Sequence, residues 1–192
     1  MLESALSDVE HAFKQLEFAI KLMCYCERGD LDKKKFDSDV TIQLDEENVE
    51  FPDGSFQSDQ EVVTASQINV GICFGVSAIV LDAAFEVAKI GRNPNSRDPK
   101  DELRTLVYMV RCAFAHNPAK PCWDARGEFA RIIQLNLGEN DLSINMVALH
   151  GNDFDYPDIG GFANWYKIQE NAVRAIKDTQ PKNQTDVESR AT

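Results

Sequence analysis

Apolar residues recur every three or four positions in four long segments of the chain, which is the spacing of an amphipathic helix. Gly29 and Gly91 follow the first two of these segments and are placed to end their helices. Asp98 followed by Pro99 is a typical helix start, with a capping side chain and a proline in the first turn. The segments cover about 2–27, 58–90, 98–116 and 162–177. The pattern therefore predicts a mainly α-helical fold.

Two other segments alternate apolar and polar residues, which is the spacing of a β-strand. The first lies at about 38–57, where a turn over residues 45–48 separates the two alternating stretches. The second lies at about 127–149, where the turn covers residues 138–141. Each segment predicts a β-hairpin inserted into the helical fold.

Length and charge restrict the classes of protein that fit this pattern. The chain has 192 residues, and residues 1–178 are expected to form one helical-bundle domain with one or two inserted β-hairpins. Residues 179–192 are polar and are expected to be a disordered tail. The formal net charge of −12 argues against broad electrostatic binding to DNA or RNA. Any contact with RNA must therefore be local.

The chain lacks the usual signals of secretion and of membrane insertion. Glu3 follows Met1 closely, so no basic segment followed by an apolar one is visible. Asp82 and Glu86 interrupt the apolar stretch that precedes them, whereas a membrane span needs about 20 apolar residues. Five cysteines without metal-binding spacing favour reduced thiols. We therefore expect a cytoplasmic protein that needs no membrane, metal or other cofactor.

Residues 110–118, Val-Arg-Cys-Ala-Phe-Ala-His-Asn-Pro, hold the main candidates for chemistry. Arg111 presents a planar charged fork that matches phosphate oxygens, and His116 can transfer a proton near neutral pH. On a continuous helix the two residues would be roughly 140° apart around the axis. Because Asn117 precedes Pro118 and is disfavoured in helical backbone, we expect the last turn to unwind and to bring His116 towards Arg111.

Four polar side chains near this motif are further candidates for binding a substrate. Each also has an ordinary structural role open to it: a solvated cation for the basic residues, packing for the tyrosine and a helix cap for the asparagine. The motif pair has a structural alternative too, in which both side chains only bond backbone carbonyls or the carboxylates of Asp124 or Glu128. The four candidates are Arg104, Tyr108, Asn117 and Lys120.

The motif resembles the R-x4-6-H signature of the HEPN superfamily, with a small apolar run, Ala-His and then an Asn-Pro break. The resemblance is strongest over residues 98–123 and extends loosely to the surrounding helices. It implies a metal-independent endoribonuclease that acts as a homodimer, with the motifs of two subunits forming one composite site. In that scheme His116 moves protons while Arg111 binds the phosphate, and RNA is cut by its own 2′-hydroxyl.

Two other functions stay open beside the ribonuclease. A non-catalytic HEPN module that binds nucleotide or a partner protein fits the acidic composition and Cys112, because members that cut RNA often carry Asn, Asp or His directly after the arginine. A structural helical dimer, in which the motif only stabilises a helix end, needs no ligand. The resemblance implies a setting in toxin–antitoxin pairs, phage defence or stress response, with an antitoxin protein as a further partner.

Overall fold

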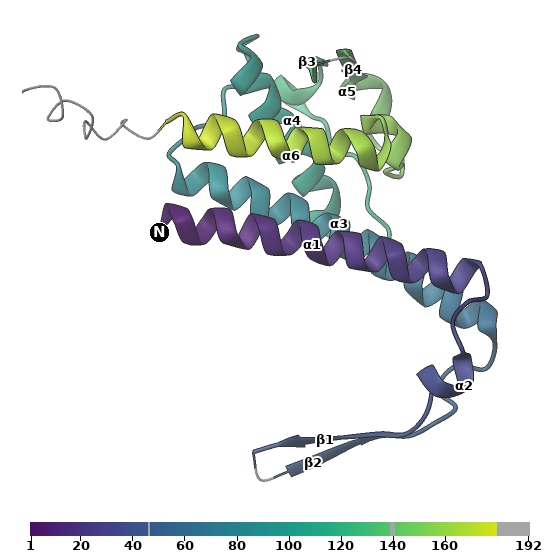
Figure 1. Cartoon of the computed structure of the whole chain (residues 1–192). Coiled ribbons are helices and arrows are strands. Elements are labelled where there is room, and N and C mark those ends of the chain that lie inside the picture. The colour runs from purple at the N-terminus through teal and green to yellow at the C-terminus, as the bar shows by residue number, and fades with distance from the viewer. Residues whose placement is uncertain (46, 139–140, 180–192) are drawn as a thin grey trace, which may run out of the picture. The chain divides into compact units, whose positions relative to one another are not determined.

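The computed structural model describes residues 1–45, 47–138 and 141–179 (Figure 1). These residues form a mainly α-helical fold with two inserted antiparallel hairpins, which confirms the predicted fold class. The α-helices are α1 (Leu2–Glu27), α2 (Lys33–Phe36), α3 (Asp59–Val87), α4 (Pro99–Ala115), α5 (Met146–Leu149) and α6 (Gly161–Lys177). The strands are β1 (Val40–Leu44), β2 (Glu47–Phe51), β3 (Ile132–Asn136) and β4 (Asp141–Asn145). Apart from Thr179, the expected disordered tail lies outside the described residues.

The chain divides into two compact units. One, which we name the motif unit, comprises Met1–Val9 with the described residues from Ala78 onward. The other, the hairpin unit, comprises Glu10–Ser77 and contains α2, β1 and β2. α1 and α3 contribute residues to both units. The expectation of a single domain over residues 1–178 stays a prediction.

Both long helices α1 and α3 end in the same hydrogen-bonded motif. After α1, Gly29 has a positive φ of 73°, and Asp30 N donates to Tyr25 O at 3.0 Å. This is the helix end that the glycine predicts. After α3, Lys89 takes the corresponding place with a φ of 57°, and Ile90 N donates to Phe85 O at 3.0 Å. The predicted end of this helix at about residue 90, with Gly91 as its terminator, is therefore corrected to Val87.

The two hairpins lie within their predicted ranges but are shorter than expected. β2 begins at Glu47, so Glu47 and Asn48, expected in the turn, belong to the strand. In the second hairpin, the alternation to residue 149 predicted a longer strand, whereas β4 ends at Asn145. There the Asn145 side chain accepts from Ala148 N at 3.3 Å and caps the short helix α5. Residues 146–149 thus do not continue the strand, although their apolar spacing suits one. The capping side chain of Asn145 gives their backbone another hydrogen-bond partner.

The core of the motif unit forms around α4, which packs on β3 and α6 (Figure 1). Its apolar stripe is buried, as the helical spacing predicts. Two tryptophans, Trp123 before the second hairpin and Trp165 on α6, are almost entirely buried in this unit. Phe154 connects Trp123 to the helix, because its ring lies 4.9 Å from Phe114 and 5.0 Å from Trp123, centroid to centroid.

Among the described helices, α3 is the one that is long and apolar enough to cross a membrane, with a mean hydropathy of 1.9 over its most apolar window. Of that window, 56% is buried inside the protein. More than half of this window is therefore covered by the chain's own residues, as in the core helix of a soluble protein. This agrees with the interpretation of the sequence, in which acidic residues near its end argued against a span.

Candidate functional site

The motif lies at the C-terminal end of α4, a helix whose start follows the predicted rules. The Asp98 side chain accepts from Lys100 N at 2.9 Å, and Pro99 occupies the first turn. The helix continues regularly to Ala115, and His116 caps it with φ −95° and ψ −39°, still in the right-handed helical region. Unwinding therefore begins after His116. The expected swing of His116 towards Arg111 does not occur, so the two side chains leave the helix roughly 140° apart around its axis.

The two motif side chains are accessible and unpaired. Arg111 is half-buried and His116 is exposed. Over residues 1–45, 47–138 and 141–179, neither side chain takes part in a hydrogen bond or an ion pair. A guanidinium and an imidazole without internal partners are available to bind an external anion.

The carboxylates considered as structural partners of the motif are occupied by other groups. Asp124 Oδ1 pairs with Arg126 Nε at 2.7 Å and lies 3.7 Å from His150 Nδ1. Glu128 Oε2 accepts from Asn95 Nδ2 at 3.4 Å. The structural alternative, in which the motif side chains bond the carboxylates of Asp124 or Glu128, therefore lacks those contacts.

The segment after the motif returns to the helix end and supports it. Cys122 N donates to Ala113 O at 3.2 Å, which satisfies one of the last carbonyls of α4. The same segment is tied to the loop after α5, because Trp123 N donates to Asn152 O at 2.9 Å. These bonds hold the backbone on both sides of His116, while its side chain stays exposed.

Asn117 and Lys120 lie in the turn that follows the helix. Asn117 Oδ1 accepts from Ala119 N at 3.1 Å and from Lys120 N at 3.3 Å, so the carbonyl oxygen of this side chain shapes the turn. Lys120 Nζ lies 3.9 Å from Asp153 Oδ2, and both side chains are largely exposed. Such a pair is weak in water, so Lys120 remains available to an anionic ligand.

Tyr108, one turn before Arg111, is half-buried and makes contacts through both its ring and its hydroxyl group. Its ring lies 5.2 Å from that of Phe129, and the Arg92 guanidinium carbon lies 4.3 Å from the ring centroid. A hydrogen bond with the Cys112 thiol, and then burial, raise the pKa of Tyr108 above its usual value, although Arg92 acts in the opposite direction. These contacts give Tyr108 a packing role that holds α4 and its neighbours together.

Arg104, also expected to bind substrate, is completely buried. Its guanidinium pairs with Asp82, lies 2.5 Å from Glu86 Oε1 and donates through Nε to Ile90 O at 3.3 Å. All of these partners come from α3 and the turn after it. Arg104 therefore fastens the end of α3 to α4, and we correct its role from substrate binding to structure, because no ligand can reach it.

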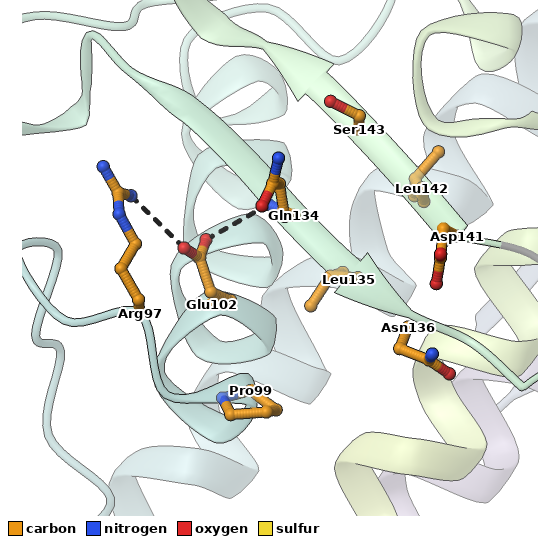
Figure 2. Close-up of a pocket in the computed structure, with 9 residues that line it drawn as sticks. All are labelled: Arg97, Pro99, Glu102, Gln134, Leu135, Asn136, Asp141, Leu142 and Ser143. Carbon is orange, nitrogen blue, oxygen red and sulfur yellow. Dashed lines mark hydrogen bonds and ion pairs between the residues drawn. The ribbon is translucent and has the colours of Figure 1, made fainter.

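A second polar cluster, which the sequence did not predict, surrounds Glu102 on α4 (Figure 2). Glu102 is 2% exposed and lines an open cavity of about 550 Å³ between the start of α4 and the second hairpin. Figure 2 shows its carboxylate between Arg97 and Gln134, at 3.2 Å from Arg97 Nη1 and 3.4 Å from the Gln134 backbone N. Arg131 Nη1 donates to both carboxylate oxygens at 2.8 Å. The signal in the sequence that could have revealed this cluster is the position of Glu102, one turn before Leu106 on the apolar face of α4.

The Glu102 cluster is satisfied mainly from within the protein. Two arginines bind the one carboxylate, which leaves the three groups with a formal charge of +1, and Nε and Nη2 of Arg131 are buried without a hydrogen-bond partner in the described part of the chain. Neither Arg111 nor His116 lines its cavity. The cluster therefore anchors the second hairpin on α4, and the exposed motif remains the candidate site. Among the described residues, no three His, Cys, Asp or Glu side chains gather closely enough to hold a metal ion.

Comparison of the chain with protein-family models, with curated proteins and with solved structures finds no match in any of the three. The resemblance to the HEPN superfamily therefore rests on the motif residues alone.

Proposed function

We propose that the protein is a HEPN-like, metal-independent endoribonuclease in which Arg111 and His116 are the catalytic residues. The observation that supports this proposal best is the state of these two side chains. Both are accessible at the end of a well-anchored helix, and neither has a partner among the described residues. A surface arginine and histidine without internal partners, five residues apart, supply a phosphate binder and a proton carrier.

The reaction needs no group beyond the RNA and these side chains. The 2′-oxygen attacks the neighbouring phosphorus while the bond from phosphorus to the 5′-oxygen breaks, which leaves a 2′,3′-cyclic phosphate and a 5′-hydroxyl. One imidazole accepts the 2′-hydroxyl proton, and a second, protonated imidazole gives a proton to the departing 5′-oxygen. Arg111 binds the phosphate and stabilises the charge that develops on it.

This chemistry favours a homodimer with a composite site. One chain supplies a single motif histidine, and its two motif side chains leave α4 on different sides. A two-fold axis near the end of α4 would bring two histidines and two arginines to one phosphate. Ala115 is exposed beside the motif, and its small side chain permits a close approach of the two helix ends. Lys120 and the Asn117 side-chain amide complete the proposed substrate contacts.

The experiment compares variants on a labelled, mixed-sequence RNA in EDTA. His116→Ala is expected to abolish cleavage with RNA affinity largely kept, and Arg111→Ala to lose cleavage and much of the affinity. His150→Ala and Arg126→Ala are matched controls, because both are exposed residues of the same type in the same unit. Cleavage that persists in His116→Ala, or that requires a divalent metal, would overturn the mechanism.

A second candidate is a HEPN module that binds nucleotide or a partner protein without cleaving RNA. Cys112, at the position directly after the motif arginine, is half-buried and its thiol bonds to Tyr108. A side chain engaged in this way has no polar group to offer to RNA. Binding of RNA or nucleotide that depends on Arg111, with no cleavage by the wild type, would favour this candidate over the enzyme.

The proposed setting is the cytoplasm, in a toxin–antitoxin, phage-defence or stress-response role with an antitoxin-like protein as partner. All five cysteines are free thiols, as a reducing compartment requires. Co-expression with a neutralising partner that suppresses RNA cleavage would test the toxin–antitoxin role.

A further inference from the structure

Exposed apolar side chains are concentrated in the hairpin unit. Fifteen large hydrophobic residues are exposed over the described residues, and ten of them lie within Glu10–Ser77. This unit contains well under half of the chain. Isolated exposed apolar residues are ordinary on a protein surface, but contiguous ones mark a surface that another molecule covers.

The first contiguous surface is one face of the β1–β2 hairpin. Ile42 pairs with Val49, and the neighbouring pair on the same face joins Val40 to Phe51. Leu44 continues this face towards the turn. Apart from the partly covered Val49, these side chains are 43–58% exposed. We name these five residues the hairpin face.

The opposite face of the hairpin is polar, because it carries the pairs of Thr41 with Glu50 and of Gln43 with Asn48. Figure 1 shows β1 and β2 as a two-stranded ribbon that follows α2, and no third strand from the described part of the chain pairs with them. An isolated two-stranded hairpin is only marginally stable in water. The hairpin face therefore requires a cover that its own unit does not supply.

The second surface lies on α3. Ile68, Ile72 and Val76 follow each other at intervals of four residues and therefore share one side of the helix. They are 42–45% exposed. We name these three residues the α3 stripe. It spans about 12 Å along the helix axis, which is close to the length of about 13 Å from Val40 to Leu44 in a strand.

We propose that the hairpin face of one copy of the chain packs on the α3 stripe of a second copy, and reciprocally, in a two-fold dimer. Each copy offers one apolar surface of each kind, and the two have similar lengths. When the hairpin face of each copy contacts the α3 stripe of the other copy, the two contacts are related by a two-fold axis. Neither surface is then left exposed. This interface uses no motif residue, so it is independent of the proposed ribonuclease function. Because the proposed composite site uses a different two-fold contact, the two contacts together would join the copies into an assembly larger than a dimer.

The area available is that of a small stable interface. Seven residues of the two surfaces are 42–58% exposed. At roughly 100 Å² for a fully exposed apolar side chain, two copies would bury about 700 Å² of apolar surface. Because protein interfaces are only about 57% apolar, this corresponds to roughly 1,200 Å² in total, the lower limit of the standard class.

Charge argues against other classes of occupant. Glu47 lies on the hairpin face next to its turn, opposite Leu44, and Asp39 and Asp45 flank β1. Glu50 lies on the other face of the same ribbon. Carboxylates so close to the apolar side chains would repel an anionic membrane surface or a nucleic acid. The occupant that fits the hairpin face is a protein surface with an apolar centre and polar edges. The α3 stripe is such a surface.

The test uses the full-length chain with opposite charges placed in the centre of each surface. Ile42→Lys and Ile72→Glu are each expected to weaken association through this interface at least 100-fold in dilution experiments followed by light scattering, so that only the contact between motifs proposed above remains. Each variant buries an unpaired charge in both contacts between the hairpin face and the α3 stripe. Mixing the two variants is expected to restore association to within about tenfold of the wild type. In the mixed dimer, one contact is the native one and the other pairs a lysine with a glutamate.

Gln43→Lys is the matched control, because it introduces the same charge on the same strand but on the polar face. It should leave association unchanged. Circular dichroism and thermal unfolding of the dissociated variants show that they remain folded. The proposal is overturned if the wild type is a monomer at tens of micromolar, if Ile42→Lys and Gln43→Lys act alike, or if the two variants fail to associate when mixed. Loss of RNA cleavage with this association pattern intact would remove only the proposed function.

Discussion

Arg104 and Arg111 lie two turns apart on the same helix, yet they differ completely in environment. Arg104 is buried between two carboxylates of α3, whereas Arg111 is half-buried and has no partner among the described residues. Their spacing in the sequence could not separate these roles. The distinction comes from Asp82 and Glu86, which reach Arg104 only through the packing of α3 on α4. Residue type at a helical position thus identified the candidates, and tertiary contacts decided between them.

Replacing these two arginines by methionine should therefore affect stability very differently. Arg104→Met is expected to lower the free energy of unfolding by about 3 kcal/mol or more, because it leaves the Asp82 carboxylate largely buried without its cation. Arg111→Met should change it by less than about 0.5 kcal/mol, as for an ordinary accessible position. Urea denaturation of both variants measures the difference, and similar losses would contradict the assigned roles.

At the scale of whole elements, local signals predicted most of the fold. Periodicity located α1, α3, α4 and α6. The Asp98–Pro99 pair marked the start of α4 and Gly29 marked the end of α1, because capping residues act on the backbone next to them. The end of α3 was missed because Lys89 takes the left-handed position that glycine usually fills. The short helix α5 was missed because alternation alone does not show where a capping asparagine ends a strand. The Glu102 cluster was missed because its arginines lie outside the helix.

The lysine at the end of α3 leads to a prediction about stability. Left-handed backbone costs a residue with a Cβ about 1 kcal/mol of conformational free energy, whereas glycine has no such cost. Lys89→Gly is therefore expected to raise the free energy of unfolding by about 0.5–1 kcal/mol, and Gly29→Ala at the matching position after α1 to lower it by a similar amount. Chemical denaturation is the measurement. A loss of stability in Lys89→Gly would show that the lysine side chain contributes more than its backbone strain costs.

At the scale of the whole molecule, the proposed mechanism requires that two helix ends meet. Cys122 is exposed and bonded through its backbone to the last turn of α4, so it reports on the distance between two motifs. A short thiol-reactive cross-linker is expected to join two copies of the wild type. Cys122→Ser should prevent this without changing the mass of the assembly in light scattering. A dimer that resists cross-linking at Cys122 would place the motifs apart and contradict the composite site.

The most direct test of the central claim is the chemistry of the RNA ends. Wild-type protein is incubated with a labelled RNA in EDTA, beside the His116→Ala variant, and the fragment ends are identified. The account predicts fragments with a 2′,3′-cyclic phosphate and a 5′-hydroxyl from the wild type and none from the variant. Fragments with other ends, cleavage by the variant, or an intact RNA with the wild-type dimer would contradict it.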